Sequence, residues 1–370
     1  MQGYYLVIDI IFAAGGTGGH IFPALAIAGR LTNANVSIAF VGRKNSMEEK
    51  LYREYGYRME TIKAVKMRRS FTGIFGFIFA YPFTVLNCYR LLGKLKPAVV
   101  LASGGFVSGP VGTAAYMRGI PLILQEQNSL PGLSSKLLNL MASVTYTAYP
   151  EAGSRFMRKE SVEMVGNPVR KFIGGLSREE GCSVIGCDPS RKNVLIIGGS
   201  QGAQSINRAM EELIGTFPSD FKDAGLIWQC GRGEDVRLKK LCGRKNINAV
   251  VKDFFGRMDA VYAAADIAVC RAGALTLSEL SQCGIPMIMI PYPYATADHQ
   301  SSNARYFQQM GAGIMIKDSP EMGELIREAL LNLLDSDDLR GRMSSAGQRM
   351  VKEDPAEIIA GKLLEYVEKK

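Results

Sequence analysis

Residues 6–28, LVIDIIFAAGGTGGHIFPALAIA, form the stretch that decides the fold of this chain. An apolar run suited to a buried strand ends in glycines, and an amphipathic helical pattern follows at once. A strand, a glycine turn and a helix open a nucleotide-binding βαβ unit, in which glycines let a ligand approach the backbone and the helix N-terminus offers free N–H groups to an anion. The stretch therefore predicts a nucleotide-binding α/β domain.

The glycine spacing of this turn is not the G-x-G-x-x-G pattern of dinucleotide-binding proteins, since its glycines are Gly15, Gly16, Gly18 and Gly19. The turn also carries a hydroxyl at Thr17 and an imidazole at His20, at the carboxyl end of the predicted strand. Because the chain has only two histidines, we interpret His20 as functional. The alternative is a packing turn whose histidine only caps the helix.

Length and composition indicate a two-domain α/β protein. A chain of 370 residues is too long for one ordinary hydrophobic core and fits two domains. The hydrophobic content is 47%, and the net charge of +9 predicts acidic partners such as nucleotide phosphates, nucleic acid or an anionic membrane surface. No nucleic-acid recognition motif accompanies the charge, so we expect no nucleic-acid partner.

The cysteines and the N-terminus indicate the compartment. The seven cysteines include no C-x-x-C pair and are typical of free thiols in a reducing compartment, with neither a disulfide framework nor a zinc site. The N-terminus lacks a basic region, and Asp9 interrupts its apolar run, so we expect no signal peptide and a cytoplasmic location.

Short apolar runs alternate with helical patterns through the first half, which predicts a doubly wound parallel sheet. Expected strands cover 36–42, 98–102, 121–124 and 143–148, and a charged helix covers 47–55. Two further turns end strands of this half, ASGGFVSGP at 102–110 and QEQNSLPG at 125–132. The carboxyl ends of these strands should meet at one sheet edge, where open α/β sheets bind ligands.

The segment 71–86, FTGIFGFIFAYPFTVL, holds no charge and is shorter than the roughly 20 residues needed to span a bilayer. It is either a buried core helix or an interfacial one. Basic flanks favour a face that docks on an anionic membrane through Ile74, Phe75, Phe77, Ile78 and Phe79. The flanking cations are Lys63, Lys66, Arg68, Arg69, Arg90, Lys94 and Lys96.

The second half repeats the organisation of the first after GNPVR at 166–170, which we interpret as a hinge. Residues 193–210 and 267–280 are two more strand-turn-helix units, further strands are expected at 226–229 and 249–251, and a helix at 258–264. From residue 321 the chain is expected to be helical, with breaks at Gly341 and at Asp354-Pro355. Two similar halves predict a ligand cleft between two domains.

The turns of the second half suit a nucleotide sugar. N–H groups of residues 199–202 and the Ser200 hydroxyl can hold a phosphate, and the helix from Ala274 directs a second N-terminus and Thr276 toward it. Glu279 lies about one turn further, where its carboxylate can accept both hydroxyls of a ribose. The alternative for Glu279 is an ordinary solvated helix residue.

Seven motifs, in this order, resemble the MurG family of glycosyltransferases over almost the whole chain: GGTGGHIFPALAIA, SGGFVSGP, EQNSLPG, GNPVR, GGSQGAQSIN, RAGALTLSEL and HQSSNA. The resemblance implies a GT-B fold with two Rossmann-like domains that face a cleft. Residues 1–167, completed by a final helix at 355–370, would bind the acceptor lipid I and associate with the membrane. Residues 168–354 would bind UDP-N-acetylglucosamine.

The resemblance also implies substrate contacts and an inverting transfer of N-acetylglucosamine to the muramyl C4 hydroxyl of undecaprenyl-pyrophosphoryl-muramyl-pentapeptide. The implied contacts are Thr17, Gly18, Gly19, Asn128, Arg170, Ser200, the backbone of Phe255, Ala274, Leu275, Thr276, Leu277, Ser278, Glu279 and Gln300. Phe106 and Gln125 depart from the family, where tyrosine and histidine are frequent, and this concentrates catalysis on His20 and Glu126.

His20 is the expected general base because imidazole changes charge near neutral pH, and Glu126 is an alternative base or orients other groups. Arg170, Ser200, Thr276 and the helix N-termini would stabilise the departing UDP, so we expect neither a metal nor a cofactor. The one D-x-D pattern, at 335–337, is interpreted as a helix N-cap.

Three other functions share these features. A related UDP-sugar transferase acting on another lipid such as diacylglycerol is the nearest, a UDP-N-acetylglucosamine 2-epimerase is the second, and a non-catalytic nucleotide-sugar-binding module is the third. An epimerase needs more acid/base residues than two histidines supply. The expected partners are UDP-N-acetylglucosamine, lipid I, an anionic membrane surface and other cell-wall synthesis proteins, at the cytoplasmic face of the membrane.

Overall fold

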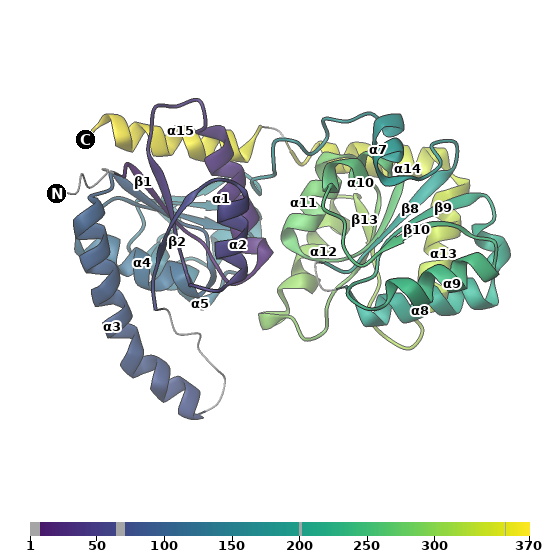
Figure 1. The fold of residues 1–370 in the computed structure, drawn as a ribbon, viewed down its shortest axis with the longest axis horizontal. Helices are drawn as coiled ribbons and strands as arrows, with labels where there is room; N and C mark the ends of the chain where they lie inside the picture. The colour runs from purple at the N-terminus through teal and green to yellow at the C-terminus, as the bar shows by residue number, and fades with distance from the viewer. Residues whose placement is uncertain (1–7, 64–70, 200–201, 352) are drawn as a thin grey trace. The chain divides into compact units, whose positions relative to one another are not determined.

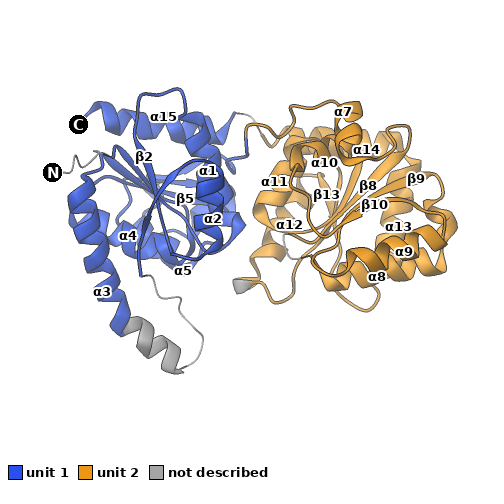
Figure 2. Ribbon diagram, viewed as in Figure 1, with its two compact units in different colours: residues 1–170, 353–370 blue, residues 171–352 orange. Residues whose placement is uncertain are grey.

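The chain forms two compact α/β units in a computed structural model (Figures 1 and 2). Unit 1 contains residues 1–170 and 353–370, and unit 2 contains residues 171–352. The structure describes residues 8–63, 71–199, 202–351 and 353–370, and the side chains of 71–78 and of 296 are likewise outside the description. The sequence-based boundaries are at 167/168 and 354/355.

Unit 1 is built on a parallel sheet of seven strands in the order β3-β2-β1-β4-β5-β6-β7. The strands are β1 (Ile10–Ala13), β2 (Ile38–Gly42), β3 (Arg58–Thr61), β4 (Val99–Ala102), β5 (Leu122–Glu126), β6 (Val144–Thr147) and β7 (Val162–Met164). Strand β1 pairs with both β2 and β4, so the strand order reverses direction between β1 and β4. At such a switch point the turns after the two strands diverge and leave room for a ligand.

The central strands read as unbroken apolar runs because helices cover both faces of a parallel sheet. All four residues of β1, β4 and β6 are buried. Strand β5 runs on to Glu126, so Gln125 and Glu126 end the strand; the sequence had placed both in the following loop. The edge strands β3 and β7 were missed, because their short segments RMET and VEM are polar and largely open to solvent.

The segment expected at 71–86 is the first part of α3, a single helix of 25 residues (Phe71–Leu95). Its C-terminal half packs on the core of unit 1 through Val85, Cys88, Leu92 and Leu95. Phe79 and Phe83 are 69% and 70% exposed. The side chains of Ile74, Phe75, Phe77 and Ile78 lie outside the described part, as do Lys66, Arg68 and Arg69.

The remaining helices of unit 1 are α1 (Gly18–Arg30), α2 (Met47–Glu54), α4 (Gly105–Met117), α5 (Leu133–Asn139), α6 (Pro150–Ser154) and α15 (Pro355–Glu368). Within the described ranges, no helix has the length and apolar character needed to cross a membrane.

The final helix, α15, lies against α1 although more than 300 residues separate them in sequence (Figure 1). Its apolar side contributes Ala356, Ile359 and Leu363 to the core around β1. Arg30, at the end of α1, forms an ion pair of 2.6 Å with Asp354, whose carboxylate also caps α15 by accepting a bond from the Ala356 N–H. Unit 1 is therefore completed by the C-terminus of the chain.

Unit 2 has a parallel sheet of six strands in the order β10-β9-β8-β11-β12-β13, with its switch point between β8 and β11. The strands are β8 (Lys192–Ile197), β9 (Ala224–Gln229), β10 (Asn248–Lys252), β11 (Ile267–Arg271), β12 (Met287–Ile290) and β13 (Gly313–Met315). The helices are α7 (Arg178–Ile185), α8 (Gln204–Thr216), α9 (Asp235–Arg244), α10 (Met258–Ala264), α11 (Ala274–Gln282), α12 (His299–Gln309), α13 (Met322–Asp335) and α14 (Asp337–Gln348).

Two predictions for the C-terminal helices need correction. Gly341 lies inside α14 and does not break the helix. The break is at Ser336, whose side chain accepts a hydrogen bond from the Leu339 N–H and is the N-cap residue. The D-x-D pattern therefore surrounds the cap, and the capping oxygen belongs to the serine between the two aspartates, because a hydroxyl in extended backbone geometry reaches the first helical turn.

Candidate functional site

His20 lies in the first turn of α1, at the switch point of unit 1, and its side chain reaches toward β5. Its Nδ1 is 2.9 Å from Oε1 of Gln127. Thr17 is the N-cap residue of α1, with an extended backbone and no side-chain cap bond. The described side-chain bond of His20 therefore goes to the end of β5 and not to the cap of its own helix.

The second glycine turn lies against the His20 ring. Gly104 and Gly105 have φ of +85° and +80°, a backbone region open mainly to glycine. A Cβ atom on Gly104 would lie 2.5 Å from Nδ1 of His20, and one on Gly105 would lie 2.0 Å from the Gly15 carbonyl oxygen. The glycines of SGGF thus allow the turn after β4 to approach the turn after β1.

A buried polar network continues from Gln127 behind the imidazole. The Gln127 Nε2 donates to the Ser103 carbonyl and to Ser103 Oγ, both at 2.8 Å, and also contacts Gln125 Oε1. Ser103 Oγ bonds to Gln125 Oε1 at 2.8 Å, and Asn167 Nδ2 donates to the Gln127 carbonyl at 3.1 Å. Our sequence analysis missed Ser103, Gln127 and Asn167, although each occurs in a motif it quoted.

Glu126 holds Asn128 in place and makes no described bond to His20. Its Oε1 accepts the Asn128 backbone N–H at 3.0 Å and the Asn128 side-chain amide at 3.3 Å. Successive residues of a strand point to opposite faces, so Glu126 and Gln125 face opposite sides of β5. The structure therefore joins the two predicted catalytic residues to different partners, His20 to Gln127 and Glu126 to Asn128.

Positive charge flanks the first glycine turn. The Arg170 guanidinium carbon is 4.7 Å from the centroid of the Phe22 ring, and a Cβ on Gly18 would lie 3.1 Å from that same ring. Arg170 is therefore held beside the predicted contacts Thr17, Gly18 and Gly19. Arg43 stacks on Phe106, the residue that departs from the family pattern, at 5.3 Å.

The GGSQGA turn of unit 2 is shaped by glycines and by Gln229. A Cβ on Gly202 would lie 2.3 Å from the Cys230 carbonyl oxygen, so only glycine fits there. Gln229 donates to the Gly199 carbonyl at 3.0 Å and accepts the Phe255 N–H at 3.0 Å. Ser200 lies outside the described residues. Because the Phe255 N–H is already bonded, its predicted backbone contact requires the carbonyl oxygen.

Helix α11 presents its first turn at the switch point of unit 2. Gly273 is the N-cap residue and supplies no capping side chain, so the N–H groups of Ala274, Leu275 and Thr276 are left for another acceptor. Leu277 differs from these, since its N–H bonds to the Gly273 carbonyl and its side chain is fully buried. The Ser278 hydroxyl donates to the Ala274 carbonyl.

Glu279 is only 3% exposed, which contradicts the alternative of a solvated helix residue. Its Oε2 accepts a hydrogen bond of 2.9 Å from the hydroxyl of Tyr262 on α10. On α12, Gln300 accepts the Tyr292 N–H at 2.9 Å. Tyr262 was missed because a tyrosine in a short apolar helix resembles any core residue.

Arg271 connects the elements that carry this second turn. Its guanidinium donates to Ser205 Oγ on α8 at 2.7 Å and to the Ile290 carbonyl at the end of β12 at 3.2 Å, and it pairs with Asp318 at 2.8 Å. The N-terminus of α8 and the ends of β11 and β12 are thereby fixed relative to one another.

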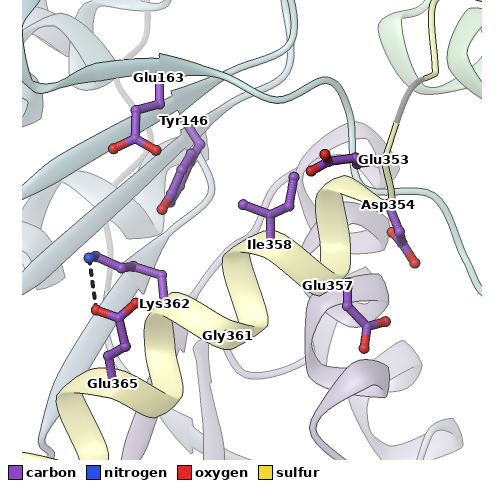
Figure 3. A pocket seen from close by; sticks show the side chains of 9 residues that line it. All are labelled: Tyr146, Glu163, Glu353, Asp354, Glu357, Ile358, Gly361, Lys362 and Glu365. Carbon is purple, nitrogen blue, oxygen red and sulfur yellow. Dashed lines mark hydrogen bonds and ion pairs between the residues drawn. The ribbon is translucent and has the colours of Figure 1, made fainter.

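One pocket of unit 1 lies between α15 and the strands β6 and β7, away from all these residues (Figure 3). It is mostly acidic, lined by Tyr146, Glu163, Glu353, Asp354, Glu357, Ile358, Gly361, Lys362 and Glu365. Lys362 forms an ion pair with Glu365. No predicted site residue lines this pocket. Among the described side chains, no group of three or more His, Cys, Asp or Glu could hold a metal ion.

Two Rossmann-like units with glycine turns at both switch points are the architecture of the GT-B fold. The profile of the glycosyltransferase family 28 N-terminal domain matches residues 10–147, and that of the C-terminal domain matches residues 193–357. The MurG structure from Acinetobacter baumannii has a TM-score of 0.75 over 97% of this chain and 99% of that one, at 24% identity. A UDP-GlcNAc 2-epimerase from Neisseria meningitidis reaches 0.67 over 98% and 100%, at 14% identity, so the fold is shared with a second enzyme class.

Sequence relatives distinguish a glycosyltransferase from an epimerase. A protein from Acidithiobacillus ferrooxidans is 37% identical over 96% of this chain and 97% of its own length, and one from Halothermothrix orenii is 36% identical over 93% and 95%. Both are named UDP-N-acetylglucosamine–N-acetylmuramyl-(pentapeptide) pyrophosphoryl-undecaprenol N-acetylglucosamine transferase. The chain belongs to this family of transferases, the MurG family.

Proposed function

We propose that the chain transfers N-acetylglucosamine from UDP-N-acetylglucosamine to the C4 hydroxyl of the muramyl sugar in undecaprenyl-pyrophosphoryl-muramyl-pentapeptide. The step converts lipid I into lipid II in peptidoglycan synthesis, with inversion at the anomeric carbon. The observation that carries this conclusion is the identity of 36% over 93% of the chain to a transferase of that name. The glycine turns at both switch points agree with it.

The donor contacts in unit 2 are part of the proposal. The first turn of α11, at Ala274, Leu275 and Thr276, offers N–H groups and a helix dipole to the pyrophosphate, together with the turn that contains Ser200. The Glu279 carboxylate, held by Tyr262, accepts the ribose hydroxyls. Leu277, Ser278, Gln300 and the Phe255 carbonyl complete the surroundings of the uridine.

His20 is the general base of this proposal. As the C4 oxygen attacks the anomeric carbon through an oxocarbenium-like state, its proton becomes acidic and is taken by the imidazole. Glu126 is the residue that orients Asn128, because its Oε1 accepts both the backbone N–H and the side-chain amide of Asn128.

The departing UDP is an anion and needs positive charge without a metal. Arg170 supplies a full charge beside Thr17, Gly18 and Gly19, and the helix N-termini supply partial charges. Ser200 and Thr276 add hydroxyl donors. Activity is therefore expected to persist in the presence of a chelator.

Helix α3 is the proposed membrane contact of a peripheral protein at the cytoplasmic face. Phe79 and Phe83 are 69% and 70% exposed, which a helix simply buried in the core does not explain. Arg90, Lys94 and Lys96 are exposed near its end and can each add about 1 kcal/mol near an anionic leaflet. Other cell-wall synthesis proteins are proposed partners at the same surface.

The test is an assay with sugar-labelled UDP-N-acetylglucosamine and three conditions: a lipid I analogue, diacylglycerol, and no acceptor. The proposal expects label in a disaccharide lipid only with lipid I. Label transfer to diacylglycerol would establish another lipid transferase, and conversion of the sugar to its C2 epimer without acceptor would establish an epimerase. UDP binding without turnover under any condition would indicate a binding module.

A further inference from the structure

The contact between His20 and Gln127 determines which imidazole nitrogen can act as a base. A neutral imidazole carries its proton on one nitrogen and a lone pair on the other, and a hydrogen-bond partner selects between the two tautomers. Here Nδ1 of His20 is 2.9 Å from Oε1 of Gln127. An amide oxygen only accepts hydrogen bonds, so Nδ1 must be the nitrogen that carries the proton.

The orientation of the Gln127 amide follows from its other partners. Its nitrogen faces the Ser103 carbonyl at 2.8 Å, and a carbonyl can only accept. Ser103 Oγ, also at 2.8 Å, and Gln125 Oε1 lie around the same nitrogen. Rotating the amide would place its oxygen against the Ser103 carbonyl and Gln125 Oε1, neither of which can donate a hydrogen bond. The amide oxygen Oε1 is therefore directed to His20.

We propose that Gln127 is a positioning residue that holds His20 as the Nδ1–H tautomer and thereby leaves the lone pair on Nε2. The catalytic use of that lone pair rests on the transfer reaction proposed above. In that reaction Nε2 takes the proton of the C4 hydroxyl while the C4 oxygen bonds to the anomeric carbon. The bond between that carbon and the UDP oxygen breaks, and its electron pair leaves with UDP. The imidazolium then releases its proton to water.

The surroundings of the pair keep this geometry rigid. Gln127 is 2% exposed, and its carbonyl accepts a bond from Asn167. Gly104 also lies against the ring and leaves no space for a side chain next to Nδ1. The amide therefore holds the ring in one orientation through a single hydrogen bond at Nδ1.

The tautomer can be measured without substrate. The chain has two histidines, so a protein labelled with ¹⁵N-histidine gives two imidazole spin systems, and the His299→Gln variant assigns them. At a pH where the ring is neutral, we expect the His20 Nδ1 to show the shift of a protonated nitrogen and Nε2 that of an unprotonated one. The opposite pattern would overturn the proposal, whether or not the transfer reaction is found.

Two substitutions at Gln127 separate positioning from packing. Gln127→Leu removes both the acceptor at Nδ1 and the donor to Ser103. Gln127→Glu, with a protonated carboxyl oxygen toward the Ser103 carbonyl, has the same shape as the amide and keeps both bonds. We expect kcat of the Leu variant to fall about 10- to 100-fold, within the contribution of a general base, with KM for the donor unchanged. The Glu variant should retain more of kcat than the Leu variant, because it still accepts a hydrogen bond from Nδ1.

The thermal unfolding of both variants is measured alongside. Equal losses of kcat in two folded variants would assign Gln127 a purely structural role, and an unchanged kcat in Gln127→Leu would also contradict the proposal. If the Leu variant does not fold, the NMR measurement on the unsubstituted protein still decides the tautomer. A wild-type protein that shows the expected tautomer but transfers no sugar would contradict the proposed function alone.

Discussion

We expect recognition of the nucleotide to depend most on Glu279. It is buried and bonded to Tyr262, so its carboxylate is fixed at the mouth of the α11 turn. We expect Glu279→Ala to weaken UDP binding by about 1.5–3 kcal/mol, the range for hydrogen bonds to charged groups. Tyr262→Phe removes only a supporting bond and should cost about 0.5–1.5 kcal/mol. Titration calorimetry measures both, and an unchanged affinity in Glu279→Ala would rule out the ribose contact.

His20 is expected to affect turnover and not donor binding. Loss of a general base typically costs 10²–10⁴ in rate, so His20→Ala should lower kcat by about 100-fold or more. The affinity for UDP-N-acetylglucosamine should stay nearly constant, which the same calorimetry checks. Turnover of His20→Ala within a few-fold of wild type would show that His20 is not the base. Glu126 would then be the candidate, and Glu126→Gln would test it.

At the residue scale, the sequence predicted His20 and Glu279 as site residues because they follow glycine turns at strand ends. Gln127 and Tyr262 were not predicted, since their roles come from contacts with residues 107 and 17 positions away, which no local pattern encodes.

The glycine turn after β4 is the element that sets the position of the His20 ring. Gly104 has φ of +85° and ψ of −178°, a region restricted to glycine, where another residue costs about 1–3 kcal/mol. We expect Gly104→Ala to lower both the melting temperature and kcat, because its Cβ would also collide with Nδ1 of His20. Gly29→Ala is the control, since that helical position has no atom within 4 Å of an added Cβ. Comparable damage from both changes would argue against a specific role for Gly104.

Helix α3 is longer than the uncharged sequence segment from which it was predicted. The uncharged run ends at residue 86, but the helix continues to Leu95. Val85, Cys88 and Leu92 form its buried side there, while the charged residues lie on the exposed side. Among the exposed apolar side chains on the described part of α3, Phe79 and Phe83 are the two most exposed, and Leu86 is 42% exposed.

The membrane role of α3 can be tested on those two residues. Phe79→Ser with Phe83→Ser should reduce binding to anionic vesicles several-fold, because two apolar anchors are lost, and should leave the melting temperature unchanged. High salt should weaken binding of the wild type as well, and neutral vesicles should bind it less. Binding that ignores lipid charge and both substitutions would make α3 a solvent-exposed helix without a membrane role.

At the scale of the whole molecule, the sequence predicted two doubly wound units because their central strands are apolar runs ending in glycine turns. No strand was predicted at β3, β7, β12 or β13. Strands β3, β7 and β13 lie at sheet edges and are only partly buried, so their patterns are weak. The strand order could not be predicted from the sequence either, because the pairing of β1 with β4 joins segments about 90 residues apart.

Buried thiols among the seven free cysteines should make the free energy of unfolding depend on pH in the alkaline range. Burial raises the pKa of Cys88 and of Cys270 to about 12, well above that of a thiol in water. Between about pH 9 and pH 12 the unfolded chain therefore loses protons that the folded chain keeps, and the free energy of unfolding falls as the pH rises. Denaturant unfolding at pH 7.5 and pH 10 should give a lower midpoint at pH 10, and a Cys88→Ala/Cys270→Ala variant should show a smaller decrease. A midpoint that falls equally in this variant would assign the alkaline loss to other groups, such as Tyr52, whose pKa burial also raises.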